Sequence, residues 1–433
     1  MVFEAARQPR FPFLPEAAIR QSQERRIRAT VTYAHAHVPY YRETMRRLLL
    51  GPADFRSAAD LARLPVIERE QLQRDPEYFL SERWPVNAYL ALRSGGTTGA
   101  PVTVFRDPPS LLIEAGQRER LRSLVARLAG RRVRYREAAI MPEDSSVMNA
   151  VNALARQSLL PTSVRVQRRT FSMLRAPSEL LPELEQYQPR VISSYGSYLE
   201  ALFTHVRGRG HALRVTRVAT YGGDGFSSRT RSWVQDELGI EVLGSYNAIE
   251  APQIGFECEH HQGYHLNVDL CPVRLIGADG HQAVDGAEGE VVISNLVNRG
   301  TMLLNYRLGD LATLLTGPCR CGRTLPLCSY LGRTKAAWLD IGDGYTIHAQ
   351  ALRLVLRSER DIWRYQIVQE TERRFLLRVV ASPDCDREAT SERLAERICE
   401  QLPAGSAVRT EFVADLPRAA SGKVQPVVGF DAQ

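Results

Sequence analysis

The sequence predicts an α/β fold: a large multi-sheet α/β N-terminal domain and a small, mobile α+β C-terminal domain. Its 433 residues exceed what one compact core usually organises, so two or three domains are expected. Between residues 190 and 300, short apolar strands alternate with helical stretches, which is typical of layered α/β structure with a partly parallel sheet. Beyond residue 332 the pattern becomes a hairpin, an amphipathic helix and a strand, which indicates α+β.

The elements follow from the spacing of apolar residues. Residues 16–50 predict two helices, the second near 45–50, and further helices are expected at 110–130, 229–238 and 385–402. The expected strands are 89–92, 102–105, 191–194, 217–220, 241–243, 290–294, 365–369, 375–379 and 408–413. We therefore expect domains at 1–332 and 333–433.

Composition narrows the class of protein. Apolar residues make up 44% and charged residues 24%, which is ordinary for a globular chain and excludes a disordered or collagen-like one. No apolar run reaches the roughly 18 residues of a membrane span, and residues 1–10 lack the apolar core of a secretory signal. We expect a cytoplasmic protein with no membrane partner, and leave a homodimer open.

Lysine is almost absent from the chain. Of 56 basic residues only Lys335 and Lys423 are lysine, and the rest are arginine. The bias itself carries no function, but a position that keeps lysine in such a chain is a candidate for needing a compact ammonium group rather than a planar guanidinium. The net charge of +7 suits anionic small molecules.

The strongest local signal is a loop between two expected strands, Ser94-Gly95-Gly96-Thr97-Thr98-Gly99-Ala100-Pro101. Its glycines allow close backbone approach, several N–H groups can point at one anion, and the hydroxyl groups add donors. The Gly-Lys-Ser/Thr ending of a Walker A loop is absent. On spacing alone, a phosphate-binding loop and a plain hairpin turn are equally good readings.

Five further segments, taken in order with this loop, resemble the adenylate-forming acyl/aryl-CoA synthetase superfamily, and most closely its phenylacetate-CoA ligase-like branch. The segments are Tyr221-Gly222-Gly223-Asp224-Gly225, Tyr246-Asn247-Ala248-Ile249-Glu250, Tyr306-Arg307-Leu308-Gly309-Asp310, Gly332-Arg333-Thr334-Lys335 and Pro417-Arg418-Ala419-Ala420-Ser421-Gly422-Lys423. The resemblance covers nearly the whole chain. The occurrence of all these segments in the order found in the family identifies it far more specifically than any one segment alone.

The resemblance implies a role for each segment in the reaction of a carboxylic acid with ATP. The loop of Ser94, Gly95, Gly96, Thr97, Thr98 and Gly99 would bind the phosphates, with Thr97 close to the chemistry. Glu250 would hold Mg²⁺, which prefers oxygen ligands. Gly223, Asp224, Tyr246 and Asn247 would lie beside the adenine, and Asp310 and Arg333 would bind the ribose. Lys423 would place its ammonium group near the α-phosphate, and Lys335 would be the hinge of the small domain.

Three positions depart from the family pattern. Ala100 stands where the phosphate loop often has lysine, Asn247 replaces glycine, and Gly244 stands where an aspartate often precedes the tyrosine by two residues. The segments expected to line the acid pocket carry few charges, which favours an aromatic or apolar acid.

Cysteine and histidine form a separate signal. Cys258-x6-His265 with Cys319-x-Cys321 offers the sulfur and imidazole ligands that Zn²⁺ prefers, and it resembles a structural zinc site found in part of this branch. His260, His261 or Cys328 could replace one of the four, and free thiols with exposed histidines remain the alternative. The odd cysteine count in a chain without a visible leader favours metal or free thiols over disulfides.

The expected function is formation of an acyl-adenylate from ATP and a carboxylic acid, and then of a thioester with coenzyme A. One alternative transfers the acyl group to an amine or to the thiol of a carrier protein supplied in trans. A second is an inactive nucleotide-binding protein. The eight arginines between residues 118 and 136 have one aromatic neighbour, so a solvated helix is favoured over nucleic-acid binding.

Overall fold

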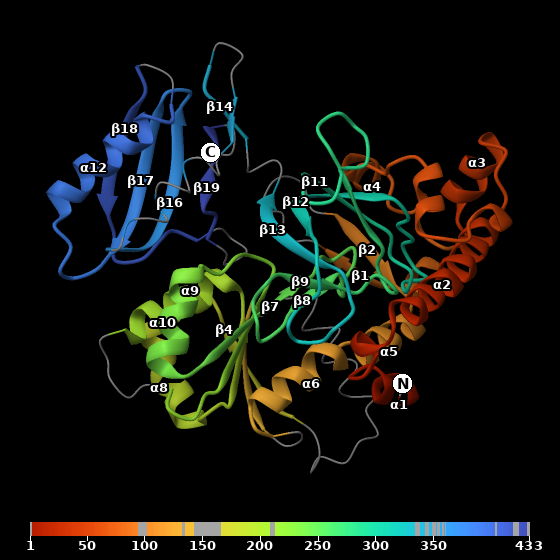
Figure 1. Ribbon diagram of the computed structural model, residues 1–433, viewed down its shortest axis with the longest axis horizontal. Helices are drawn as coiled ribbons and strands as arrows, with labels where there is room; N and C mark the ends of the chain where they lie inside the picture. Colours follow the sequence, from red (N-terminus) through yellow and green to blue (C-terminus); the bar gives the residue numbers. More distant parts are fainter. Residues whose placement is uncertain are drawn as a thin grey trace.

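The computed structural model describes residues 2–93, 102–131, 135–142, 166–207, 213–333, 338–342, 346–348, 352, 356, 359, 361–402, 405–418 and 424–430. An eleven-stranded sheet in the order β10-β11-β12-β13-β9-β8-β7-β6-β5-β3-β4 forms the centre of the large body (Figure 1). The C-terminal residues form a second, separate sheet that shares no strand with this one.

The central sheet changes character along its width. Its parallel half consists of β3 (Arg136–Met141), β4 (Gln167–Ser172), β5 (Val191–Ser194), β6 (Val218–Gly222) and β7 (Glu241–Tyr246). Its antiparallel half consists of β8 (Gly255–Glu257), β9 (Tyr264–Leu266), β10 (Val273–Ile276), β11 (Glu288–Ile293), β12 (Tyr306–Leu315) and β13 (Leu327–Arg333). The expectation of a partly parallel sheet is confirmed.

Helices cover both faces of the parallel half, because successive strand residues point to opposite faces. Ile192 packs with α8 (Pro177–Tyr187), α9 (Gly196–Val206) and α10 (Ser228–Leu238). Val191 packs on the opposite side with α6 (Glu119–Leu128). The single helix expected at 110–130 is two helices, α5 (Pro108–Gln117) and α6, which meet at Arg118 just after the helix-weakening Gly116.

N-terminal helices cover the antiparallel half, except that the first of them packs on α5. They are α1 (Val2–Arg7), α2 (Glu16–His37), α3 (Pro39–Arg47) and α4 (Arg69–Arg74), with 3-10 turns at Phe11–Phe13, Pro52–Asp54, Ala59–Arg63 and Val86–Ala88. The second helix expected near 45–50 is present but lies earlier in the chain, because α3 starts at Pro39 and ends at Arg47. A proline excludes helical backbone at the residue before it and suits the first helical position, so α2 ends and α3 begins there.

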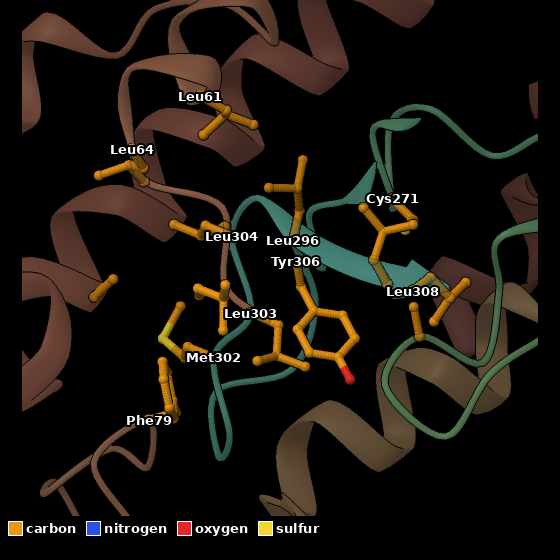
Figure 2. Packing of buried hydrophobic residues seen from close by; sticks show 14 of the residues in the cluster. Leu61, Leu64, Phe79, Cys271, Leu296, Met302, Leu303, Leu304, Tyr306 and Leu308 are labelled. Carbon is orange, nitrogen blue, oxygen red and sulfur yellow. The ribbon is translucent and has the colours of Figure 1, made fainter. Parts of the chain in front are cut away.

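Figure 2 shows the largest core, around Tyr306. Leu61 and Leu64 reach it from the helical group, and Leu303 and Leu304 reach it from the segment just before β12. Asn305 ties the two together, since its side-chain amide donates to Leu64 O at 2.6 Å. The start of β12, which carries two of the candidate site residues, is therefore fixed by a deep core.

The C-terminal lobe has its own sheet in the order β18-β17-β16-β19. Its elements are β16 (Ile362–Thr371), β17 (Arg374–Ala381), α12 (Arg387–Cys399), β18 (Ala407–Phe412) and β19 (Val427–Val428). The expected hairpin is β16 and β17, and Asp386 caps the expected helix by accepting from Ala389 N at 3.1 Å. A separate core lies between α12 and the sheet. The lobe lies beside α9 and α10 (Figure 1).

Two small hairpins complete the description. β1 (Leu90–Arg93) pairs antiparallel with β2 (Thr103–Arg106), as the strand–loop–strand reading expects. β14 (Trp338–Asp340) pairs with β15 (Thr346–His348). Among the helices of the described residues, none has both the length and the apolar character needed to span a bilayer.

Candidate functional site

The structure brings together side chains from two of the predicted segments, 246–250 and 306–310. Tyr246, the last residue of β7, donates from its hydroxyl group to Asp310 Oδ2 at 2.8 Å, and Tyr306 donates to Glu250 Oε1 at 3.2 Å. Glu250 and Asp310 are each only 4% exposed. Burial, reinforced by the nearby Asp310 charge, raises the pKa of Tyr246 well above its usual value, so its hydroxyl group remains a donor.

Neighbouring elements hold Glu250 in place. Arg69 of α4 forms an ion pair with Glu250 Oε1 at 3.4 Å, and Asn295 donates to the backbone oxygen of Glu250 at 2.8 Å. Arg106 of β2 donates to Ile249 O at 2.6 Å. Sequence reasoning missed Arg69, because it lies 181 residues from its partner and in no recognisable motif.

Asp224 lies in the loop after β6 and contacts the start of α9. Its Oδ1 accepts from Gly196 N and Ser197 N, and its Oδ2 accepts from Ser197 Oγ at 2.5 Å. A carboxylate at a helix N-terminus satisfies free N–H groups and complements the helix dipole. The two loops touch so closely that a Cβ on Gly196 would lie 2.2 Å from Gly225 O. Gly223, beside Asp224, has a positive φ of 80°.

The two departures at β7 have different surroundings. Asn247 is exposed, with its side-chain amide 2.8 Å from Ser245 Oγ. Gly244 is buried, and its N–H donates to Glu257 Oε2 at 2.6 Å. Arg231 also binds Glu257, at 3.0 and 2.9 Å, so the carboxylate and its partners fill the space that a side chain at 244 would need.

Other predicted residues are located only through their neighbours. The phosphate loop (residues 94–99), Lys335 and Lys423 lie outside the described residues. The strands on either side of the loop are β1 and β2. Arg333 is the last residue of β13, and its backbone pairs with that of Asp310. Val424, which follows Lys423, donates its N–H to Ser197 Oγ at 3.3 Å.

A second site lies away from this group. The ligand atoms of Cys258, His265, Cys319 and Cys321 all lie within 4.8 Å of one another. Cys258 Sγ is 3.6 Å from Cys319 Sγ, and Cys321 Sγ is 3.3 Å from His265 Nε2. Burial, helped by the charge of Arg323, lowers the pKa of His265 to about 4, which keeps the imidazole neutral, the form that ligates metals.

Two of the three residues considered as substitutes, His261 and Cys328, are occupied elsewhere. His261 contacts Glu241 and Arg231. Cys328 is buried in the largest core. Three thiols and one neutral imidazole at this spacing match the ligand set of a closed tetrahedral metal site, and all but the half-buried Cys321 are buried.

Comparisons with known proteins find relatives named phenylacetate-coenzyme A ligase. Residues 342–429 match the family model of the CapK C-terminal domain. The phenylacetate-coenzyme A ligase of Escherichia coli K12 is 25% identical over 315 residues, covering 70% of this chain and 69% of that protein. The namesake from Pseudomonas putida is 24% identical over 311 residues, covering 70% and 68%.

Solved structures share the fold. A 2-hydroxyisobutyryl-CoA ligase in its postadenylation state with an acyl-AMP superposes with a TM-score of 0.75 at 18% identity, over 98% of this chain and 93% of that one. The same ligase with CoA in its thioesterification state scores 0.60 at 19% identity, over 97% and 91%. An o-succinylbenzoate-CoA synthetase from Bacillus subtilis with AMP scores 0.51 at 18% identity, over 77% and 67%.

Proposed function

We propose that this chain, a phenylacetate-CoA ligase-like member of the adenylate-forming superfamily, is an AMP-forming acid–CoA ligase. It activates a carboxylic acid with ATP to an acyl-adenylate and then transfers the acyl group to coenzyme A. The observation that carries the proposal is the convergence of Tyr246, Glu250 and Asp310, which come from two separate motifs of the predicted series. The curated relatives support an aromatic or apolar acid.

The first step is attack of the acid carboxylate on the α-phosphorus, with departure of pyrophosphate. Asp310, oriented by Tyr246, would accept from the ribose hydroxyl groups, and Arg333, whose backbone pairs with that of Asp310, is the proposed second ribose residue. The residues 94–99 hold the phosphates and keep the reacting atoms aligned. Glu250 is the residue that would hold Mg²⁺, whose charge offsets the negative charge of the phosphates.

The lysine supplies the charge needed at the reacting phosphorus. An ammonium group from Lys423 stabilises the negative charge that develops as pyrophosphate leaves. The contact of Val424 with Ser197 supports this role, because it holds the C-terminal lobe against the loop that contains Gly223 and Asp224. The division into residues 1–332 and 333–433, with a hinge at Lys335, lets the lobe move between the two steps.

We also infer that Cys258, His265, Cys319 and Cys321 hold zinc in a structural role. Four protein ligands leave no open position for a substrate, so these residues would hold a metal that links the β8–β9 connection to the β12–β13 connection. Such a metal would stabilise the fold at this junction and take no part in the reaction.

Acid-dependent ATP–pyrophosphate exchange over aryl, arylacetic and fatty acids tests the function. Exchange with one class of acid, followed by thioester formation with free CoA, is the expected result. Asp310→Asn should abolish most exchange, whereas Asp279→Asn, at an exposed turn, is the matched control. Transfer only to a carrier-protein thiol or an amine would select the alternative acceptor. No exchange with any acid would favour an inactive nucleotide-binding protein.

A further inference from the structure

A stacked arginine joins the two bodies of the molecule. The guanidinium group of Arg207, at the end of α9, lies 5.0 Å from the ring centroid of Trp233 in α10 and 4.8 Å from that of Trp363 in β16. A cation over the face of an indole ring is attracted by the ring's electron density. One arginine of the large body therefore binds a tryptophan of its own body and a tryptophan of the C-terminal lobe.

Packing connects the stacked Trp363 to Val424, the residue that directly follows Lys423. Trp363 packs against a small apolar cluster that contains Val424 and Leu416. Val424 donates its N–H to Ser197 Oγ at 3.3 Å, and the Ser197 hydroxyl group in turn donates to Asp224. A shift of Trp363 away from Arg207 would therefore move the residue that directly follows Lys423.

The other side of the segment meets the same helix. Arg418 lies 4.7 Å over the ring of Tyr198 and donates to Met173 O at 3.4 Å. Tyr198 and Ser197 are adjacent in the first turn of α9. The residues on both sides of the stretch 419–423 thus contact the first turn of one helix, whose last turn leads to Arg207.

A second arginine supports the stack at the edge of β16. Arg229 of α10 donates to Ile362 O at 3.0 Å and also to Glu359 O. Its partners are backbone atoms, so this contact fixes where β16 begins, one residue before Trp363. Together, Arg229 and Arg207 attach the start of β16 to the α9–α10 pair.

We propose that Arg207 is a positioning residue for adenylation, holding the C-terminal lobe through Trp363 so that Arg418 and Val424 meet the first turn of α9. The inference rests on the proposed function. Under the proposed function, the lobe is expected to take a second arrangement relative to the large body for thioester formation. Releasing the stack favours the other arrangement, so the two half-reactions respond differently.

The half-reactions are measured separately on the full chain. With the acid that gives the fastest exchange in the wild type, Arg207→Ala is expected to lower kcat for ATP–pyrophosphate exchange by roughly 5- to 30-fold, the weight of a stacked cation, with a smaller change in KM for ATP. Thioester formation from added acyl-adenylate and CoA is expected to be unchanged or faster. Arg207→Lys should recover part of the loss, because the charge remains.

The matched control is Arg169→Ala. Arg169 is also stacked, 4.9 Å from Phe171 and 5.8 Å from Tyr187, but both rings belong to the large body. It should leave the ratio of the two half-reactions as in the wild type. Equal loss of both half-reactions in Arg207→Ala, or the same change in Arg169→Ala, would overturn the proposal.

Amide hydrogen exchange tests the docking without any substrate. Residues 424–430 should exchange faster in Arg207→Ala than in the wild type, because the Val424 N–H loses its partner more often, and should be unaltered in Arg169→Ala. Unaltered exchange in Arg207→Ala would also overturn the inference, even in an active enzyme. A wild type that activates no acid would refute the proposed function, while this measurement still decides the docking.

Discussion

Tyr246 donates a 2.8 Å hydrogen bond to Asp310 from a site that solvent barely reaches. The carboxylate is thereby held in one orientation within β12, a strand that the largest core fixes. Because burial raises the pKa of Tyr246, this donor persists into the alkaline range. The KM for ATP should therefore not change through ionisation of Tyr246 between pH 7 and pH 9.

Tyr246→Phe is expected to raise the KM for ATP about tenfold, with a smaller effect on kcat. A hydrogen bond to a charged group contributes about 1.5–3 kcal/mol, and its loss frees Asp310 to turn. Pyrophosphate exchange against ATP concentration measures the effect. Tyr187→Phe, which loses a bond to Gln167 O far from Asp310, is the control. An unchanged KM in Tyr246→Phe would remove Tyr246 from the site.

Lys423→Ala is expected to lower acid-dependent pyrophosphate exchange by about 100-fold or more, the usual effect of removing one group that stabilises transition-state charge. ATP binding, measured by calorimetry, should be nearly unchanged, because the loop and ribose contacts remain. Arg409→Ala removes a cation from the same lobe at an exposed ion pair and should keep exchange. Full exchange in Lys423→Ala would refute the role of this lysine.

Purified protein is expected to carry about one zinc per chain, bound by four protein ligands. Cys319→Ser should lose the metal and lower Tm, because the two connections it joins come apart. Cys385→Ser, outside the cluster in the C-terminal lobe, should keep both. Elemental analysis with thermal unfolding measures the two effects. A zinc content well below one per chain would reject the site.

Asp415 predicts a pH dependence for the lobe. Burial raises its pKa, but the charges of Arg364 and Arg418 outweigh burial and hold the pKa below its usual value. An acid with a lowered folded-state pKa stabilises the fold above its unfolded pKa of about 4, and this contribution is lost as the pH falls through the folded value.

Asp415→Asn should therefore cost about 1 kcal/mol at pH 7, the scale of a half-exposed ion pair, and much less near pH 3. Urea unfolding followed by tryptophan fluorescence at both pH values checks this. Asp384→Asn, at an exposed position of the same lobe, is the control and should change the free energy of unfolding little at either pH. An equal cost at both pH values would show that the Asp415 charge is unimportant.

Gly244→Ala is expected to destabilise the protein by about 1–3 kcal/mol, the usual cost of overpacking. A Cβ there would lie 2.6 Å from Tyr264 Oη and 2.7 Å from Glu257 Oε2. Gly51→Ala is the control, since the nearest atom to its Cβ would be 3.8 Å away. Equal stability of the two variants, measured by urea unfolding, would contradict the account of this family departure.

The sequence predicted what local periodicity and spacing encode. The alternating strands and helices after residue 190 and the hairpin of β16 and β17 are confirmed, because each buries a regular pattern of apolar residues. The strands β8 and β9 have three residues each, too few to show a period. The four metal-ligand candidates were chosen from two short spacings, and the structure brings them together.

The remaining features depend on contacts between distant residues. The pairing of Arg69 with Glu250 and the stacking of Arg207 on Trp363 join segments that no local pattern relates. In a chain with 54 arginines, an arginine with a specific partner looks the same in the sequence as one in solvent. In the sequence, Gly244 is only a departure from the family's aspartate, whereas in the structure the Glu257 carboxylate lies beside it and accepts its N–H.

The short strand β19 follows the lysine segment closely and pairs in parallel with β16 through Ile367 and Val368. The residues that follow Lys423 are therefore part of the lobe's own sheet. Because Val427 and Val428 belong to this sheet, the chain that follows Lys423 would move with the lobe, and the proposed delivery of the ammonium group would involve a rotation of the whole lobe. Drag from the solvent opposes the rotation of a large object, and turnover limited by that rotation would slow in proportion to added viscogen.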